Sequence, residues 1–431
     1  LEDLAVPRHD PRKTAPETSV IAAGLINDFH GVFGLWRIDG YDSVIETLTN
    51  SFELWRGGEG QTNLIAFPYD WRLSNRVAAA QLKALIERRL PEFRKATNNP
   101  GAKVILVGHS MGGLVARYYL EVLEGWRDCR ALVSFGTPYR GAVGPLDYLS
   151  NGYKNTLLGQ TFVELTTVLR SMPAVYELLP RYRALKHNDV WCRPAEAGPL
   201  PGIDQDYARA ALDFHLEIDA AVQRNGKDAD YMKERYLVFP VVGAGQPTMN
   251  SAVFKEGGIL CSEGNPDWLD PELEAGDGTV PRVSATPEDR TTEFREIFFA
   301  ERHASLQCND SILFDLIERI KQMQAPKHAP ALGGVLLTVP ALGLAIQELY
   351  APGEPAEVVV RAKDIDRFGK LHAVAVRSGA EGAKATFTRS GDHWRANLGE
   401  LSAGQYRITV ATEKSGSGAP TPVHDVFEVA R

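Results

Sequence analysis

The stretch Lys103–Gly112, KVILVGHSMG, contains the apolar run Val104–Val107, followed at once by a G-x-S-x-G pattern. A short run that is apolar throughout predicts a strand buried on both faces of a sheet. A helical pattern follows from about Met111 to Leu123. Ser110 is therefore expected in a sharp strand-turn-helix, the setting in which a serine hydroxyl is exposed as a nucleophile.

The glycines of this turn have a physical role in that interpretation. We expect Gly108 and Gly112 to be required, because side chains at these positions would clash with a crowded and strained turn. The N-terminus of the following helix would favour a negative charge that develops beside Ser110. The alternative is a glycine-rich turn without chemistry, so the pattern needs support from the rest of the chain.

Further strands are predicted on both sides of this stretch. Helical patterns at about 77–93 and 312–320 alternate with them, and such alternation is typical of a parallel sheet covered by helices. The predicted strands are Asn63–Phe67 (NLIAF), Ala131–Phe135 (ALVSF), Tyr236–Val242 (YLVFPVV) and Arg295–Phe299 (REIFF).

The remaining segments differ in pattern. Residues from about 145 to 231 are mostly helical in pattern and are interrupted by prolines, which indicates an inserted cap. Residues 324–334 (QAPKHAPALGG) have the composition of a linker. From 335 to 431 about seven short runs with a period of two predict an immunoglobulin-like β-sandwich. The expected organisation is an α/β domain over 1–323, the linker and the sandwich.

Composition excludes several classes of function. The chain has 431 residues, with 47 Lys and Arg against 55 Asp and Glu, a net charge of -8. It lacks the basic stripe that nucleic-acid binding requires. Its four cysteines show no zinc-ligand spacing, so no metal is expected. The apolar run Ala331–Ile346 is shorter than the roughly 20 residues of a membrane span, and a buried strand is expected there. No leader pattern follows Leu1; the compartment stays open, with a cytoplasmic or peripheral-membrane location favoured.

A serine nucleophile needs a base and an acid, in the chain order serine, acid, histidine for this kind of turn. His303 follows REIFF and precedes the last helix, which is the expected place for the base. His187 and His215 also follow the serine but fall in the cap, where ordinary structural roles are expected. His109 lies inside the turn and is expected to point elsewhere.

The proposed acid is Asp277, which lies between two glycines in a loop after YLVFPVV and upstream of His303. An Asp-Gly pair is also common in plain turns, so Asp267, Asp270 and Asp289 remain as alternatives.

Several motifs together resemble the lecithin:cholesterol acyltransferase and phospholipid:diacylglycerol acyltransferase family. They are FPYDWR at 67–72, GHSMGG at 108–113, SFGTPYRGA at 134–142, GDGTVPRVSATP at 276–287 and the His303 loop. The resemblance covers about residues 20–322. It implies an α/β-hydrolase fold in which a serine takes an acyl group from a lipid ester and passes it to an alcohol or water, with no cofactor. It assigns Ser110, Asp277 and His303 to a triad and makes the backbone N–H of Met111 one oxyanion donor.

The chain departs from that family in one respect. Family members carry, ahead of the region matching Ser19–Tyr41, a strand and glycine-containing loop that supply the second oxyanion N–H. The first 18 residues are polar and contain prolines. That strand would lie between NLIAF and KVILV, and its absence would leave backbone groups unpaired. We hypothesise that an N-terminal segment, now a separate chain, fills the slot; the alternative is that Ser19–Ile26 (SVIAAGLI) fills it.

By the same resemblance, residues 29–41 form a lid-like region near an acyl pocket, which makes Trp36 a candidate substrate contact. Trp71 and Arg72 are further candidates, although the PYDWR string could equally be a structural corner. The expected partner is an acyl lipid, free or at a membrane surface, and the β-sandwich could bind a protein. The competing hypothesis is a non-catalytic hydrolase-like protein that binds a lipid or a partner.

Overall fold

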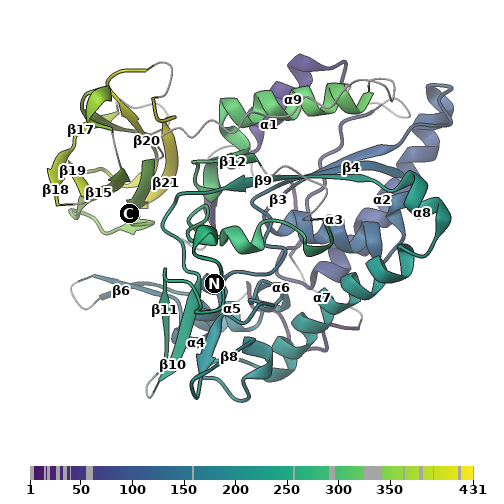
Figure 1. Ribbon diagram of the computed structural model, residues 1–431, viewed down its shortest axis with the longest axis horizontal. Coiled ribbons are helices and arrows are strands. Elements are labelled where there is room, and N and C mark those ends of the chain that lie inside the picture. The colour runs from purple at the N-terminus through teal and green to yellow at the C-terminus, as the bar shows by residue number, and fades with distance from the viewer. Residues whose placement is uncertain are drawn as a thin grey trace.

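The computed structural model describes residues 4–13, 16, 20–25, 30–32, 36–38, 40–54, 62–157, 160–255, 258–290, 297–324, 342–362, 365–377, 382–391, 393–415 and 419–430. These residues form an α/β part and a C-terminal part built from β-strands, which lie side by side (Figure 1).

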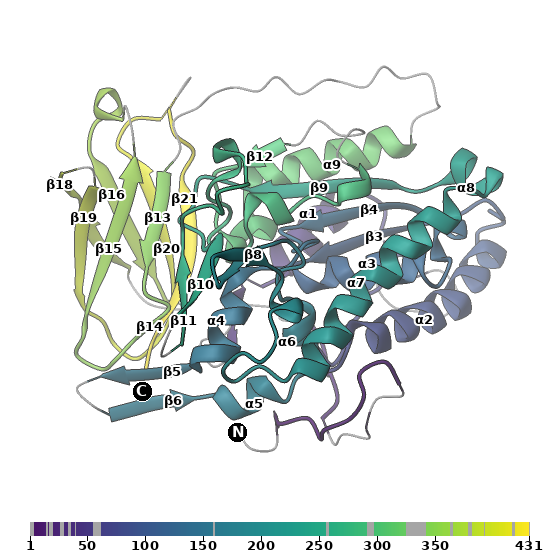
Figure 2. The ribbon, with the colours of Figure 1, turned by 60° about the horizontal axis from the view of Figure 1, so that its bottom comes forward.

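A four-stranded parallel sheet forms the centre of the α/β part. Its order is β12 (Ile297–Phe299), β9 (Leu237–Gly243), β4 (Cys129–Phe135) and β3 (Val104–His109). Helices α2 (Asn75–Ala96), α3 (Met111–Glu121) and α7 (Gln205–Asn225) pack on one face, and α1 (Asp42–Ser51) and α9 (Asp310–Gln324) cover the other (Figure 2). An α/β-hydrolase-like sheet with helices on both faces is therefore present.

Two predictions about the β3 side of the sheet are wrong. Asn63–Phe67 forms no strand, and β3 is not buried on both faces, since Val107 is 41% exposed. A strand needs a neighbour for its backbone N–H and C=O groups, and within the described ranges β3 pairs only with β4. NLIAF and KVILV therefore do not pair with each other, and the apolar side chains of β3 stay only partly covered.

The segment predicted as a cap, about 145–231, contains helices, as expected, and also strands. Its helices are α7, described above, with the shorter α4 (Val143–Asn151), α5 (Thr166–Arg170), α6 (Pro173–Glu177) and α8 (Ala229–Glu234). It also contains a hairpin of β5 (Lys154–Leu157) and β6 (Gln160–Glu164). A second sheet has the order β11 (Gly258–Ser262), β10 (Ser251–Lys255), β7 (Leu185–His187) and β8 (Val190–Cys192). Strands β10 and β11 come from the chain after β9, so this pairing depends on contacts that local periodicity does not reveal.

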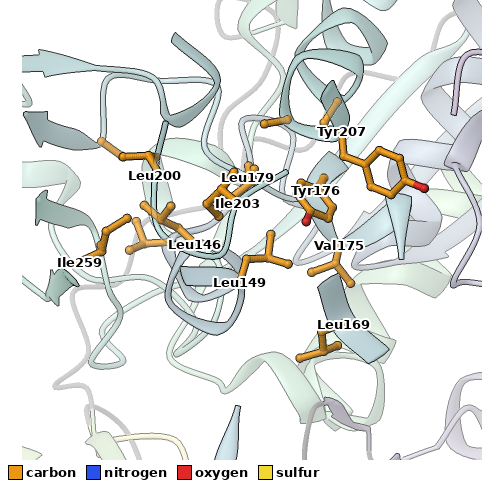
Figure 3. Close-up of a cluster of buried hydrophobic side chains, with 14 of the residues drawn as sticks. Leu146, Leu149, Leu169, Val175, Tyr176, Leu179, Leu200, Ile203, Tyr207 and Ile259 are labelled. Atoms are coloured by element: carbon orange, nitrogen blue, oxygen red, sulfur yellow. The ribbon is translucent and has the colours of Figure 1, made fainter. Parts of the chain in front are cut away.

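The cap has its own apolar core (Figure 3). Leucines of α4 pack with side chains of α6, α7 and β11, and the rings of Tyr176 and Tyr207 meet edge to face at 5.3 Å. The buried Glu177 fixes this core to the start of α2, because its carboxylate accepts hydrogen bonds from the Ser74 hydroxyl at 2.5 Å and the Asn75 amide at 2.7 Å. The cap is thus anchored to the sheet-covering helices.

The C-terminal part consists of two sheets with a shared core. One has the order β13 (Leu342–Ile346), β15 (Pro355–Ala362), β19 (His393–Glu400), β18 (Thr388–Ser390), and the other β14 (Leu349–Tyr350), β21 (Val423–Val429), β20 (Gly404–Thr412), β16 (Leu371–Val376), β17 (Ala383–Thr386). Tyr350, Phe427 and Val358 are fully buried between them. The immunoglobulin-like assignment stays a prediction. Of the run Ala331–Ile346, only Leu342–Ile346 lies in the described residues, and the linker 325–334 lies outside them.

None of the helices in the described ranges combines the length and the apolar character needed to cross a membrane.

Candidate active site

Ser110 lies between the end of β3 and the start of α3, with φ 52° and ψ -123°. This region is rarely occupied by residues other than glycine. The conformation is held by a hydrogen bond from the Ser110 amide to the carbonyl oxygen of Phe135 at 2.8 Å and by one from the Thr137 hydroxyl to the Ser110 carbonyl at 2.9 Å. The end of β4 therefore supports the turn at the end of β3.

The sequence predicts that a side chain would clash at both Gly108 and Gly112, and the structure supports this only for Gly108. A Cβ at Gly108 would lie 2.9 Å from the backbone carbon of Gly112, which no real Cβ tolerates. At Gly112 itself the nearest atom, the Tyr69 hydroxyl, is 3.9 Å away, so the expected clash there is wrong. The crowding is at Gly108, where an added Cβ would meet the backbone of Gly112 and Gly113 at the start of α3.

Three side chains from different strand ends meet in direct contact. His303 begins a short 3₁₀ helix, His303–Cys308, that follows β12. Its Nε2 is 2.9 Å from the Ser110 Oγ, and its Nδ1 is 2.7 Å from the Asp277 Oδ2. An ionised carboxylate only accepts, so Nδ1 carries the proton and Nε2 can accept from the serine hydroxyl. This is the geometry in which an imidazole can act as a base toward a serine.

The loop of Asp277 is shaped to hold its carboxylate. The second oxygen, Oδ1, accepts hydrogen bonds from the amides of Val280 at 2.7 Å and Thr279 at 2.9 Å. The His303 amide also donates to the Asp277 carbonyl oxygen at 2.8 Å. Asp277 is 1% exposed. The two loops are therefore joined by backbone as well as side-chain contacts.

The alternative acids contact other parts of the protein. Asp289 forms an ion pair with Arg117 at 2.7 Å, Asp267 accepts from the Trp191 indole at 3.0 Å, and Asp270 is exposed.

The two cap histidines also have partners away from the serine. His187 contacts the Ala197 carbonyl oxygen at 3.1 Å, and His215 contacts that of Glu177 at 2.9 Å.

The sequence predicts that His109 points away from the candidate site, but the structure places it in contact with His303. Its Nε2 is 2.9 Å from the carbonyl oxygen of His303, and the two rings lie 4.8 Å apart. A carbonyl only accepts, so His109 Nε2 is the donor and Nδ1 faces the Tyr41 hydroxyl at 3.3 Å. Burial, aided by the neighbouring His303, lowers the pKa of His109 to about 3. The only sequence signal for this role was its position in the turn.

A small cavity opens beside Ser110 and His303. Its wall combines apolar side chains such as Pro138, Leu178 and Met249 with polar and charged ones, and its volume is about 100 Å³. Pockets that enclose a drug-sized ligand start at about 300 Å³, so the described residues enclose only the reacting end of a larger molecule. The amide of Met111 is the first of α3, one of the N–H groups that lack a partner within the helix. No cluster suited to a metal ion occurs within the part of the chain that the structure describes.

Part of the chain is similar to known proteins. Residues 29–209 match the family model described as lecithin:cholesterol acyltransferase. This part of the chain is therefore similar to the lecithin:cholesterol acyltransferase family.

Individual relatives match over a similar region. A phosphatidylcholine-sterol acyltransferase from Gallus gallus is 37% identical over 229 residues, 51% of this chain and 52% of that protein. The lysosomal phospholipase A and acyltransferase from Homo sapiens is 28% identical over 256 residues, 56% of this chain and 57% of that protein. The chain thus spans about half the length of these relatives. A structural match to the Bacillus licheniformis lipase BlEst2 in its propeptide form covers 83% of this chain and 83% of that protein, with 13% identity and a TM-score of 0.32.

Two of the candidate substrate contacts, Trp71 and Arg72, lie outside the lining of this cavity. Arg72 is 2% exposed, and its guanidinium contacts Asp70 at 2.6 Å and the Leu4 carbonyl oxygen at 3.0 Å. Trp71 packs against the apolar cores, and neither residue belongs to the cavity lining. These contacts favour the structural-corner interpretation. The backbone of Trp36 is in β2 (Trp36–Ile38), which pairs with β1 (His30–Val32), but its side chain lies outside the described residues.

The two glycines of the turn at Ser110 should respond differently to replacement by alanine. Gly108→Ala should lower the free energy of unfolding by about 1–3 kcal/mol, because an added methyl overlaps backbone atoms. Gly112→Ala should change it by less than about 0.5 kcal/mol, since there is room and alanine favours a helix. Urea unfolding of both variants checks this, and equal losses would contradict the packing described here.

His109 should make the protein acid-sensitive. Its pKa is lower in the folded protein, about 3 against 6.5, so the unfolded chain binds the extra proton and stability falls as the pH drops below 6.5. At pH 5 this amounts to about 2 kcal/mol relative to pH 7.5.

His109→Gln tests this because the amide can still donate to the His303 carbonyl but does not titrate. Between pH 7.5 and pH 5 the variant should lose about 2 kcal/mol less stability than the wild type in urea unfolding. Other titrating groups are common to both proteins and cancel in this difference. Identical losses would show that His109 is protonated in the folded state.

Proposed function

We propose that the chain is a serine ester hydrolase or O-acyltransferase that acts on acyl lipids through an acyl-enzyme intermediate. The observation that carries this proposal is the unbroken contact from Asp277 through His303 to Ser110 beside a cavity whose wall is partly apolar. The names of the relatives, a phosphatidylcholine-sterol acyltransferase and a phospholipase A and acyltransferase, support lipid esters as the substrate class.

In the proposed mechanism, Ser110 Oγ attacks the ester carbonyl carbon while His303 Nε2 takes its proton. Asp277 holds the ring and stabilises its cationic form. The tetrahedral intermediate collapses as His303 returns the proton to the leaving alcohol oxygen, which leaves the acyl group on Ser110. Water or a second alcohol then loses a proton to His303 and attacks the acyl carbon. The bond from that carbon to Ser110 Oγ breaks as His303 returns the proton to the serine oxygen, which releases the acid or a new ester and restores the free enzyme.

The oxyanion of each intermediate requires hydrogen-bond donors. We assign one to the amide of Met111, at the positive end of α3. For the second, we propose a segment that precedes Leu1 in the natural protein and adds a strand to β3. The pairing of β3 with β4 alone within the described ranges, and the exposure of Val107, support a place for such a strand.

The catalytic proposal is tested with a small fluorophosphonate. Wild-type protein should be labelled on a single serine and Ser110→Ala should not, while both unfold at similar temperatures. Ser110→Ala should also lower ester turnover by about 10⁴-fold or more, because the nucleophile is removed. A folded wild-type protein that is neither labelled nor active on any ester would instead support a non-catalytic protein that binds a lipid or a partner.

Hydrolysis and acyl transfer are separated by the products. The purified protein is incubated with phospholipid vesicles, with and without a long-chain alcohol. We expect free fatty acid in both cases and an additional ester only if the alcohol reaches the acyl-enzyme. A protein that labels on Ser110 but cleaves only water-soluble short-chain esters would contradict lipids as the substrate class.

The second donor has its own test. The chain is compared alone and after co-expression with the residues encoded directly upstream of it. Labelling of Ser110 should be about 10²-fold faster in the second preparation, the usual effect of one oxyanion donor. Equal rates would show that the described chain already holds a complete oxyanion site.

A further inference from the structure

We propose that the C-terminal β-sandwich is a working part of the candidate active site, because it positions the loops that carry His303 and Asp277 and supplies part of the cavity wall. This inference rests on the proposed function, since it concerns the same three side chains. Both ribbon views show β21 as the sandwich strand nearest the α/β part (Figures 1 and 2).

The first link is Glu301, which lies two residues before His303 and is fully buried. Its Oε1 accepts from the amides of Arg302 and His424, both at 2.9 Å. Its Oε2 accepts from the Asn309 amide group at 2.9 Å and contacts the His424 Nδ1 at 2.8 Å. One carboxylate thus joins both ends of the histidine loop to β21, and four partners leave it little freedom to move.

Arg302 forms the second link. It directly precedes His303, and its Nε is 2.9 Å from Asp425 Oδ2 on β21. Its Nη1 donates to the Leu344 carbonyl oxygen on β13 at 2.8 Å. The guanidinium therefore contacts one strand from each sheet of the sandwich. The side chains of the ion pair are only 15% and 8% exposed, so solvent screens this contact weakly.

A third link reaches the loop of Asp277. Gln246 is fully buried, and its side chain donates to the Leu342 carbonyl oxygen at 3.0 Å and accepts from the Leu344 amide at 2.9 Å. Its backbone exchanges hydrogen bonds with Gly276, the residue before Asp277, at 3.0 Å and 3.2 Å. Gln246 therefore links β13 of the sandwich to the loop that carries Asp277 by hydrogen bonds.

The sandwich also lines the cavity. Glu348, Asp425 and Val426 belong to the same wall as Ser110 and His303. A sandwich that served only as a separate module would not need to approach the site. Here its buried polar contacts converge within two residues of two of the three candidate catalytic side chains. Misplacement of a catalytic group by about 1 Å can cost on the order of 10²-fold in rate, so these contacts bear on activity.

The positioning role is tested in the full-length chain with His424→Ala, since His424 is outside the cavity lining. The matched control is His372→Ala, in β16 of the same sandwich, where the ring contacts only Thr386 among the described hydrogen bonds. The readouts are the rate of Ser110 labelling by a small fluorophosphonate, and kcat and KM for a short-chain ester. Thermal unfolding shows that each variant is folded.

We expect His424→Ala to lower the labelling rate and kcat by about tenfold or more with KM little changed, because the imidazole of His303 is less well placed. His424→Gln, whose amide can donate to Glu301, should recover most of the rate, and His372→Ala should behave as the wild type. If His424→Ala does not fold, the isosteric Asp425→Asn replaces it, with the labelling rate by the small fluorophosphonate as its readout, because Asp425 also lines the cavity and can alter KM.

The wall role is tested with Val426→Ala. This variant should raise KM for a long-chain ester several-fold and leave the labelling rate unchanged.

The outcomes that overturn the inference are distinct from failure of the proposed function. A folded His424→Ala or Asp425→Asn variant that labels as fast as His372→Ala would refute the positioning role, and an unchanged KM in Val426→Ala would refute the wall role. A wild-type protein that does not label at all would overturn the proposed function, and this inference with it.

Discussion

The imidazole of His303 is the point on which the described architecture converges. Its two nitrogens contact Ser110, which follows β3, and Asp277, whose loop comes after β11 in the chain and lies beside Gly243 at the end of β9. His303 itself follows β12. Such contacts are possible because parallel strands in register end at one edge of a sheet. The register pairs His109 with Phe135, Phe135 with Val241, and Phe299 with Gly243.

Short loops at that edge require close backbone approach. Gly136, directly after β4, has φ +54°, and a Cβ there would lie 2.7 Å from the Asp277 Oδ2 and 2.8 Å from the His303 Nδ1. The contact between acid and base therefore occupies the space beside a residue without a side chain. His109 also holds His303 in place by a hydrogen bond to its carbonyl oxygen. Burial lowers the pKa of His109 and keeps it neutral, so His109 places no positive charge beside the His303 ring.

The sandwich changes how the division into domains is understood. Composition and the change of period separate it from the α/β part, yet Glu301, Arg302 and Gln246 bind it through buried polar groups. A buried carboxylate or amide without partners costs free energy, so these three residues make the placement of the two parts specific. The match to the lecithin:cholesterol acyltransferase family model covers residues 29–209, so these links lie outside the matched region.

Local patterns were enough to predict the strand-turn-helix at Ser110, most of the central strands and helices, and the order of serine, acid and histidine. They succeed because an apolar run, a helix period and a crowded glycine turn are properties of neighbouring residues. The same patterns were wrong about Asn63–Phe67 and the burial of β3, and they missed the strands of the cap, because a strand exists only where another segment pairs with it. Only the tertiary structure placed His109 against His303 and joined Glu301 to His424, 123 residues away. No sequence period records such a contact, since its energy depends on burial and geometry that arise only when the chain is folded.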